Sequence, residues 1–263
     1  MTPATPAVAW DPAQYLRHAD HRSRPFHDLA ARIPHTPDRV VDLGCGPGNT
    51  TVTLLDRWPN ARITGVDNSP AMIEKARRDY PRTAFRLGDI TGYDPAADNP
   101  APDLLLSNAA LQWVPDHADL FPRWIEGLPA GGVLAFQVPG NFGEPTHTLL
   151  ADLCASPRWA DRLGGLHRPA VLHPTEYLNR LTALGCTVDA WETTYYQVLQ
   201  GRAPVLDWML GTGLRPALGA LPDQADRDAF LAEYAALLAE AYPSASHGTV
   251  LPYRRIFVIA TKD

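Results

Sequence analysis

The chain has few cysteines and no long apolar segment, and its first residues do not have the pattern of a signal peptide. Its three cysteines, Cys45, Cys154 and Cys186, are odd in number and far apart in 263 residues, which fits neither a disulfide framework nor a metal site. No apolar run approaches the roughly 18 residues that a membrane-spanning helix needs. Residues 1–9 lack the basic start and apolar core of a signal peptide. These absences predict a soluble cytoplasmic protein with a disordered tail at residues 1–9, no metal and no membrane partner.

The chain also lacks an excess of positive charge. It has 23 Lys and Arg against 29 Asp and Glu, for a net charge of -6. Nonspecific binding to nucleic acid needs a surplus of cations, so nucleic acid is not an expected partner. A small anionic substrate needs only a local cationic pocket and is compatible with this composition.

Short apolar runs alternate with amphipathic stretches from residue 38 to residue 138. The run at 103–107 has three consecutive leucines at its centre, as expected of a strand that is buried on both faces. Ser69 and Pro70 are typical of a helix start. The pattern predicts strands at 39–43, 61–66, 83–87, 103–107 and 132–136, and helices at 49–57, from Ser69-Pro70 onward, and at 119–128. Such alternation indicates an α/β fold with a Rossmann-like, doubly wound, mostly parallel seven-stranded sheet.

After residue 138 the alternation is less regular. We expect helices at 145–154, 174–184 and 223–242, and strands at 187–199 and 255–261. The helical material at 145–174 and 204–243 exceeds what a sheet of this size needs. It is therefore predicted to form a helical cap over the site.

A glycine-rich turn follows the first predicted strand. Gly44, Gly46 and Gly48 let the backbone bend sharply and approach a ligand closely, beside the free N–H groups of a helix start. The Gly-x-Gly-x-Gly spacing differs from the dinucleotide pattern Gly-x-Gly-x-x-Gly. Asp42, at the strand end, would repel a pyrophosphate but suits a cationic sulfonium. The turn thus favours S-adenosylmethionine over NAD, the alternative being a tight turn without a ligand.

Further polar residues follow later strands, at the edge where doubly wound sheets bind ligands. Asp67 could accept the ribose hydroxyls or could simply begin a helix cap with Asn68. Asp89 could accept adenine amino hydrogens while Ile90 packs on the ring, or it could be a solvated turn residue. Asn108 belongs to a small polar loop that can border the reactive methyl group. The predicted cofactor site is Asp42, Gly44, Gly46, Gly48, Asp67, Asn68, Asp89, Ile90 and Asn108.

These motifs resemble class I S-adenosylmethionine-dependent methyltransferases, and within them the trans-aconitate 2-methyltransferase family. The resemblance covers about residues 10–263. It is carried by residues 42–50, 67–72, 108–116 and 139–142, and by Trp10-Asp11-Pro12, Tyr15-Leu16, Arg22-Ser23-Arg24-Pro25, Trp191-Glu192-Thr193-Thr194-Tyr195, 213–216 and 252–257. It implies methyl transfer from S-adenosylmethionine to one carboxylate of a small polycarboxylic acid, trans-aconitate or similar, giving a monomethyl ester and S-adenosylhomocysteine. His18-Ala19 stands where the family usually has Phe-Ser, so the acid accepted could differ.

A multiply charged acid requires desolvated cationic partners, and guanidinium groups match carboxylates best. Arg254 and Arg255 would point to opposite faces of an extended strand, and Arg255 is preferred because it begins the apolar run. Any single arginine could instead be solvated, and the aromatic candidates could be scaffold residues. The predicted substrate site is Arg22, Arg24, Trp113, His147, Tyr195, Arg215 and Arg255.

The predicted organisation is a tail at 1–9, an N-terminal helical lid at 10–37, an S-adenosylmethionine-binding core at 38–138, and the remaining strands with the cap on the substrate side at 139–263. A carboxylate is already ionised at neutral pH, so alignment and exclusion of water should supply the acceleration, and no catalytic base is predicted. The alternatives are a methyltransferase for another small O or N acceptor, a NAD-dependent oxidoreductase, and an S-adenosylmethionine-binding protein without turnover.

Overall fold

The computed structural model describes residues 19–166 and 171–263, with side chains from residue 23 onward in the first helix. The predicted tail at 1–9 and residues 10–18 of the predicted lid lie outside this range. The rest of that lid contains helix α2 (Ala19–Ala31), which packs on the sheet.

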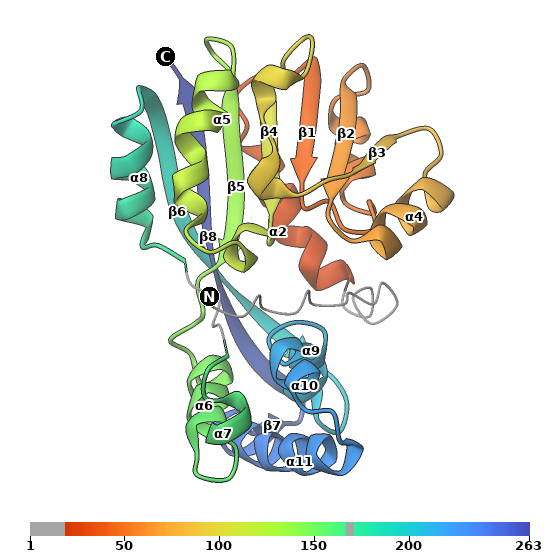
Figure 1. Ribbon diagram of the computed structural model, residues 1–263, viewed down its shortest axis with the longest axis vertical. Helices are drawn as coiled ribbons and strands as arrows, with labels where there is room; N and C mark the ends of the chain where they lie inside the picture. The colour runs from red at the N-terminus through yellow and green to blue at the C-terminus, as the bar shows by residue number, and fades with distance from the viewer. Residues whose placement is uncertain (1–18, 167–170) are drawn as a thin grey trace.

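A single twisted sheet forms the upper part of the molecule (Figure 1). Its strand order is β3-β2-β1-β4-β5-β8-β6, in which β3 to β5 are parallel and β8 is antiparallel to both of its neighbours. A two-residue strand, β7 (Ser244–Ala245), also pairs with β8. The other strands are β1 (Arg39–Leu43), β2 (Arg62–Asp67), β3 (Ala84–Leu87), β4 (Leu104–Asn108), β5 (Val133–Pro139), β6 (Cys186–Leu199) and β8 (Gly248–Lys262). The predicted Rossmann-like α/β fold is confirmed, with β7 added to the seven expected strands.

Helices cover both faces of the sheet, which explains the apolar character of its central strands. Alternate residues of a strand face opposite sides, so Leu104 and Leu106 pack with α2 residues Phe26 and Leu29. Leu105 belongs to the core on the other side, which also contains residues of α5 (Phe121–Gly127) and α8 (Pro174–Thr182). The buried layers hold the carboxyl ends of the parallel strands in fixed register.

Two helix starts differ in how well the sequence predicts them. Helix α4 (Pro70–Asp79) begins as expected, because the Ser69 side chain accepts a hydrogen bond from the Met72 amide. The helix expected at 49–57 instead starts as a 3₁₀ turn at Thr51–Thr53 and continues as α3 (Leu54–Arg57). Gly48, with φ of +79°, extends the turn and delays the helix.

A separate helical lobe lies below the sheet (Figure 1) and consists of α6 (Pro145–Ala155), α7 (Ala160–Leu163), α9 (Pro204–Leu210), α10 (Arg215–Ala220) and α11 (Gln224–Ala241). It has its own core, in which Trp159, Trp208 and Phe230 are buried. Strands β6 and β8 run from the sheet into this lobe. β8 begins at Gly248 and not at Arg255 as expected, since Leu251 and Tyr253 pack into the lobe core while the strand is still paired with β6. Among the described residues, no helix has both the length and the apolarity required to cross a membrane.

Candidate active site

The glycine loop packs tightly against the loop that follows β4. A Cβ atom added at Gly44 would lie 2.2 Å from the Ala110 Cβ, and Gly44 has φ of +80°. Only glycine fits both constraints at this position. The close approach brings the ends of β1 and β4 together at one edge of the sheet.

Asp42 lies beneath this loop and is only 2% exposed. Thr51 donates a hydrogen bond of 2.6 Å from its hydroxyl to the Asp42 carboxylate. Burial raises the pKa of Asp42 to about 7, the Thr51 hydrogen bond opposes this rise, and the nearby Asp67 carboxylate adds to it. The carboxylate therefore supports the loop from behind through Thr51. Contact of Asp42 with a cofactor stays a prediction.

Asp67 joins the glycine loop to the start of α4. One of its oxygens accepts a hydrogen bond of 2.9 Å from the Gly46 amide, and the other accepts one of 2.9 Å from the Ser69 amide. Burial raises its pKa, and these two hydrogen bonds act in the opposite direction. The oxygen that binds the Ser69 amide fits the helix-cap interpretation, because Ser69 caps α4. Each of the two oxygens also keeps a lone pair that could accept a hydrogen bond from a ribose hydroxyl.

Asn68 and Asp89 lie next to each other at the ends of β2 and β3, and both are exposed. The Thr91 hydroxyl and amide hydrogen bond to Asp89 at 2.6 and 2.7 Å and lower its pKa, with a further contribution from Asn68. Ile90 is buried beside Gly44. The ionised carboxylate of Asp89 thus lies next to the apolar side chain of Ile90 at the end of β3.

At the end of β4, Asn108 has a buried side-chain oxygen with no hydrogen-bond partner among the described residues. Such a group costs free energy unless a donor reaches it. With Asp67 and Asp89 it forms a row of acceptors along the glycine loop. The row suits a ligand that has a diol, an amino-substituted ring and a cationic group.

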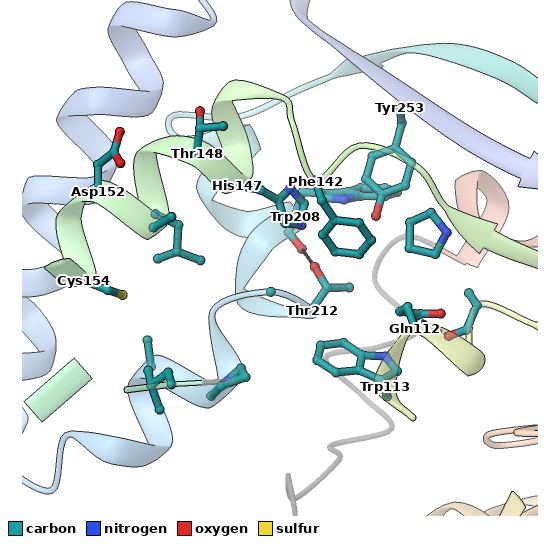
Figure 2. Close-up of a pocket in the computed structure, with 18 of the residues that line it drawn as sticks. Gln112, Trp113, Phe142, His147, Thr148, Asp152, Cys154, Trp208, Thr212 and Tyr253 are labelled. Atoms are coloured by element: carbon teal, nitrogen blue, oxygen red, sulfur yellow. Dashed lines mark hydrogen bonds between the residues drawn. The ribbon is translucent and has the colours of Figure 1, made fainter. Parts of the chain in front are cut away.

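A cavity of about 420 Å³ lies between this edge of the sheet and the helical lobe. Figure 2 shows Gln112 and Trp113 on its sheet side, with Phe142, His147 and Thr212 contributed by the lobe and its connections. Among the predicted substrate residues whose side chains are described, Trp113, His147 and Arg255 line this cavity. Asn108 also lines it, so the cavity adjoins the row of acceptors.

Arg255 supplies a buried cation to the cavity wall. It is 3% exposed, donates a hydrogen bond of 3.0 Å to the Gln137 side-chain oxygen, and stacks over the Tyr253 ring at 4.6 Å. Arg254 faces the other way, where it pairs with Glu192 and donates to the Gly140 carbonyl at 2.9 Å. Strand alternation therefore separates the two arginines as the sequence predicted.

His147 packs its ring against Phe142 at 4.9 Å in an edge-to-face arrangement. Burial lowers the pKa of His147 to about 4. The imidazole is therefore neutral near pH 7 and offers hydrogen bonding without a positive charge.

Of the other predicted substrate residues with described side chains, Arg24, Tyr195 and Arg215 do not line the cavity. Tyr195 donates a hydrogen bond of 2.6 Å to Asp28 of α2, and Arg24 stacks over the Tyr195 ring at 4.9 Å. Arg215 opens α10 beside Pro216, which does line the cavity. Of Arg22 only the backbone, within α2, is described. Contact of these four residues with substrate stays a prediction.

Several wall residues carry no local sequence signal of their role. Thr148, Trp208, Thr212 and Tyr253 come from α6, from α9 and the turn after it, and from β8. They meet only because the lobe folds against the edge of the sheet. The predicted cap at 145–174 and 204–243 and the resemblance at 213–216 and 252–257 indicate this region, but not these four side chains.

The class of protein is a methyltransferase. It has a Rossmann-like sheet, a glycine loop with acidic residues at the ends of β2 and β3, and a cavity beside the end of β4. A family model described as a methyltransferase domain matches residues 40–132. The chain is 58% identical to the trans-aconitate 2-methyltransferase of Streptomyces coelicolor over 99% of this chain and 88% of that protein, and 54% identical to that of Streptomyces avermitilis over the whole of both. The chain belongs to the trans-aconitate 2-methyltransferase family.

The fold is also similar to a solved structure, phosphoethanolamine N-methyltransferase 2 of Haemonchus contortus in complex with phosphomonomethylethanolamine and S-adenosylhomocysteine. The TM-score is 0.53 at 14% identity, over 91% of this chain and 52% of that chain. At this identity the likeness shows the shared fold.

Proposed function

We propose that the protein transfers a methyl group from S-adenosylmethionine to one carboxylate of a small polycarboxylic acid, trans-aconitate or a close analogue. The products are the monomethyl ester and S-adenosylhomocysteine. Family membership supports the acceptor class. The observation that carries the proposal is the buried guanidinium of Arg255, in the wall of a cavity that opens beside Asn108.

The row of acceptors along the glycine loop fits the cofactor. Asp67 would accept the ribose hydroxyls, Asp89 the adenine amino group beside Ile90, and the Asn108 oxygen the cationic amino group. When bound, S-adenosylmethionine supplies an electrophilic methyl group on a sulfonium. We assign cofactor binding to residues 38–138 and acceptor binding to 139–263, with 10–37 as the lid.

The chemistry requires little beyond alignment. An acceptor carboxylate is already ionised at neutral pH, so it would take the methyl group supplied by the bound cofactor without any proton having to be removed. Arg255 would hold the acid in place, while Trp113 and the lobe wall exclude water and strengthen the charge pairing. Positioning of the two reactants then provides most of the acceleration.

A second candidate is methylation of another small O or N acceptor, for which a proton must leave. His147 is neutral in the cavity wall and is the residue that would accept it. A general base works best when its pKa lies near the operating pH, so a pKa of about 4 makes His147 a weak base. This favours an acceptor that is already ionised.

An acceptor panel tests the proposal. The protein is incubated with S-adenosylmethionine and trans-aconitate, other polycarboxylates, a phenol or a primary amine, and S-adenosylhomocysteine is quantified. We expect turnover with polycarboxylates only. Turnover confined to the phenol or amine would overturn the acceptor class, and absence of turnover despite S-adenosylhomocysteine binding in calorimetry would indicate a silent binding protein. In the same calorimetry NADH is the negative control, and we expect it not to bind.

A further inference from the structure

Three polar side chains form a row across the sheet at its carboxyl edge. Asn108 of β4 is the register partner of Gln137 in β5, and Arg255 of β8 is the register partner of Pro139, two residues further along β5. The alternation of each strand places all three on the face that is covered by α2, because Leu106, Ala135 and Phe257 belong to that layer. Asn108, Gln137 and Arg255 therefore connect the proposed cofactor site to the buried guanidinium.

Gln137 is the middle member and is fully buried at 0% exposure. Its side-chain oxygen accepts the 3.0 Å hydrogen bond from Nη1 of Arg255. Its side-chain nitrogen is also buried and has no hydrogen-bond partner among the described residues. A buried amide in an apolar strand is costly to retain, so its single hydrogen bond, to the guanidinium, indicates a role in orienting that group.

The direction of the Arg255 side chain follows from this bond. Nη1 reaches Gln137 on the intervening strand β5, so the guanidinium lies on the β4 side of its own backbone. Strands in a sheet are spaced roughly 4.8 Å apart, which puts the backbones of β4 and β8 roughly 10 Å apart. Because the long side chain shortens this gap, one small tricarboxylate can reach from the Asn108 edge to the guanidinium.

We propose that Gln137 is a positioning residue that fixes Arg255 to bind a carboxylate of the acceptor other than the one that is methylated. This inference rests on the proposed function, and it makes the site selective for acids with at least two separated carboxylates. Gln137 acts through Arg255 and touches neither the cofactor nor the reacting atoms.

The test compares Gln137→Met with the wild type, using trans-aconitate as acceptor. Loss of the orienting bond should raise KM for trans-aconitate about tenfold or more, the size expected for a hydrogen bond to a charged group. The kcat should change less than KM, and the dissociation constant of S-adenosylhomocysteine should stay within about twofold of the wild type. Gln197→Met is the matched control, since Gln197 is another buried glutamine, in β6, away from the cavity wall.

Gln137→Glu provides a second variant if the methionine variant fails to fold. Glutamate keeps an acceptor for Nη1, but its negative charge would pair with the guanidinium and compete with the carboxylate of the acceptor. KM for trans-aconitate should therefore rise in this variant too. A variant that folds and keeps the KM of the wild type would overturn the inference. So would a variant in which kcat and the affinity for S-adenosylhomocysteine fall by as much as KM rises. If the wild type forms no ester from trans-aconitate, the proposed function fails instead, which keeps the two failures distinct.

Discussion

Thr51 donates a hydrogen bond of 2.6 Å to Asp42 in the buried space beneath the glycine loop. The pair links the start of the helical segment after the loop to the end of β1. Because Asp42 is 2% exposed, its charge has no solvent to stabilise it, and the carboxyl titrates near neutral pH.

This burial predicts an unusual pH dependence of stability. The pKa of Asp42 is raised from 3.8 to about 7 in the folded state, so the folded protein holds an extra proton between these values. The contribution of Asp42 to the free energy of unfolding should therefore fall as pH rises from about 4 to about 7. The decrease should be on the order of 4 kcal/mol, since each pKa unit corresponds to about 1.4 kcal/mol.

Asp42→Asn isolates this effect from other titrations. Denaturant unfolding of both proteins between pH 4 and 7 gives the difference in free energy of unfolding, wild type minus variant. The difference should decline across the range. A flat difference would show that Asp42 is ionised throughout.

The two glycines of the loop should differ in their tolerance of a side chain. Gly44→Ala creates an overlap with Ala110 at a backbone φ of +80° and should destabilise the protein by about 3 kcal/mol. Gly46→Ala meets nothing within 4 Å and has φ of +55°, so it should cost only about 1 kcal/mol. Chemical denaturation measures both. Equal losses would contradict the close approach of the two loops.

Removal of the Asp67 carboxylate should weaken cofactor binding. Asp67→Ala loses two backbone hydrogen bonds that order the loop, as well as the proposed ribose acceptor, and should raise the dissociation constant of S-adenosylhomocysteine about 10- to 100-fold. Asp79→Ala is the control, because Asp79 pairs with Lys75 at the far end of α4. Calorimetry that finds equal affinities for the two variants would remove Asp67 from the cofactor site.

The neighbouring arginines provide a matched pair. Arg255→Met should raise KM for trans-aconitate by about tenfold or more with unchanged affinity for S-adenosylhomocysteine, since Arg255 lines the cavity. Arg254→Met should alter KM much less, because Arg254 pairs with Glu192 on the opposite face. Steady-state kinetics decide between them. A larger effect at Arg254 would reverse the assignment.

The cofactor half of the molecule was largely predictable from sequence because its signals are local. Strand β1 has the predicted bounds, and the Ser69-Pro70 cap begins α4 as expected. Turn glycines, caps and apolar runs each act within a few residues of the feature they specify. The 3₁₀ start at Thr51 is not predicted from local signals, since it follows Gly48, which has a positive φ and leaves no space for a side chain beside Phe85.

The acceptor half was less predictable because its contacts are distant in sequence. Gln137 reads as one polar residue in an apolar strand, and its partner Arg255 lies more than a hundred residues later. The hydroxyl of Tyr195, a predicted substrate residue, bonds to Asp28 and ties β6 to α2, a contact that no local sequence pattern indicates. Which face a strand residue occupies follows from alternation, whereas what covers that face depends on the tertiary fold.

The most direct test of the account is the identity of the methylated product. The protein is supplied with trans-aconitate and S-adenosylmethionine that carries a trideuterated methyl group, and the products are analysed by mass spectrometry. We predict a single ester that retains the intact labelled methyl group, formed in equal amount with S-adenosylhomocysteine. Failure to esterify any polycarboxylate, together with label in a phenol or amine from the same panel, would contradict the account.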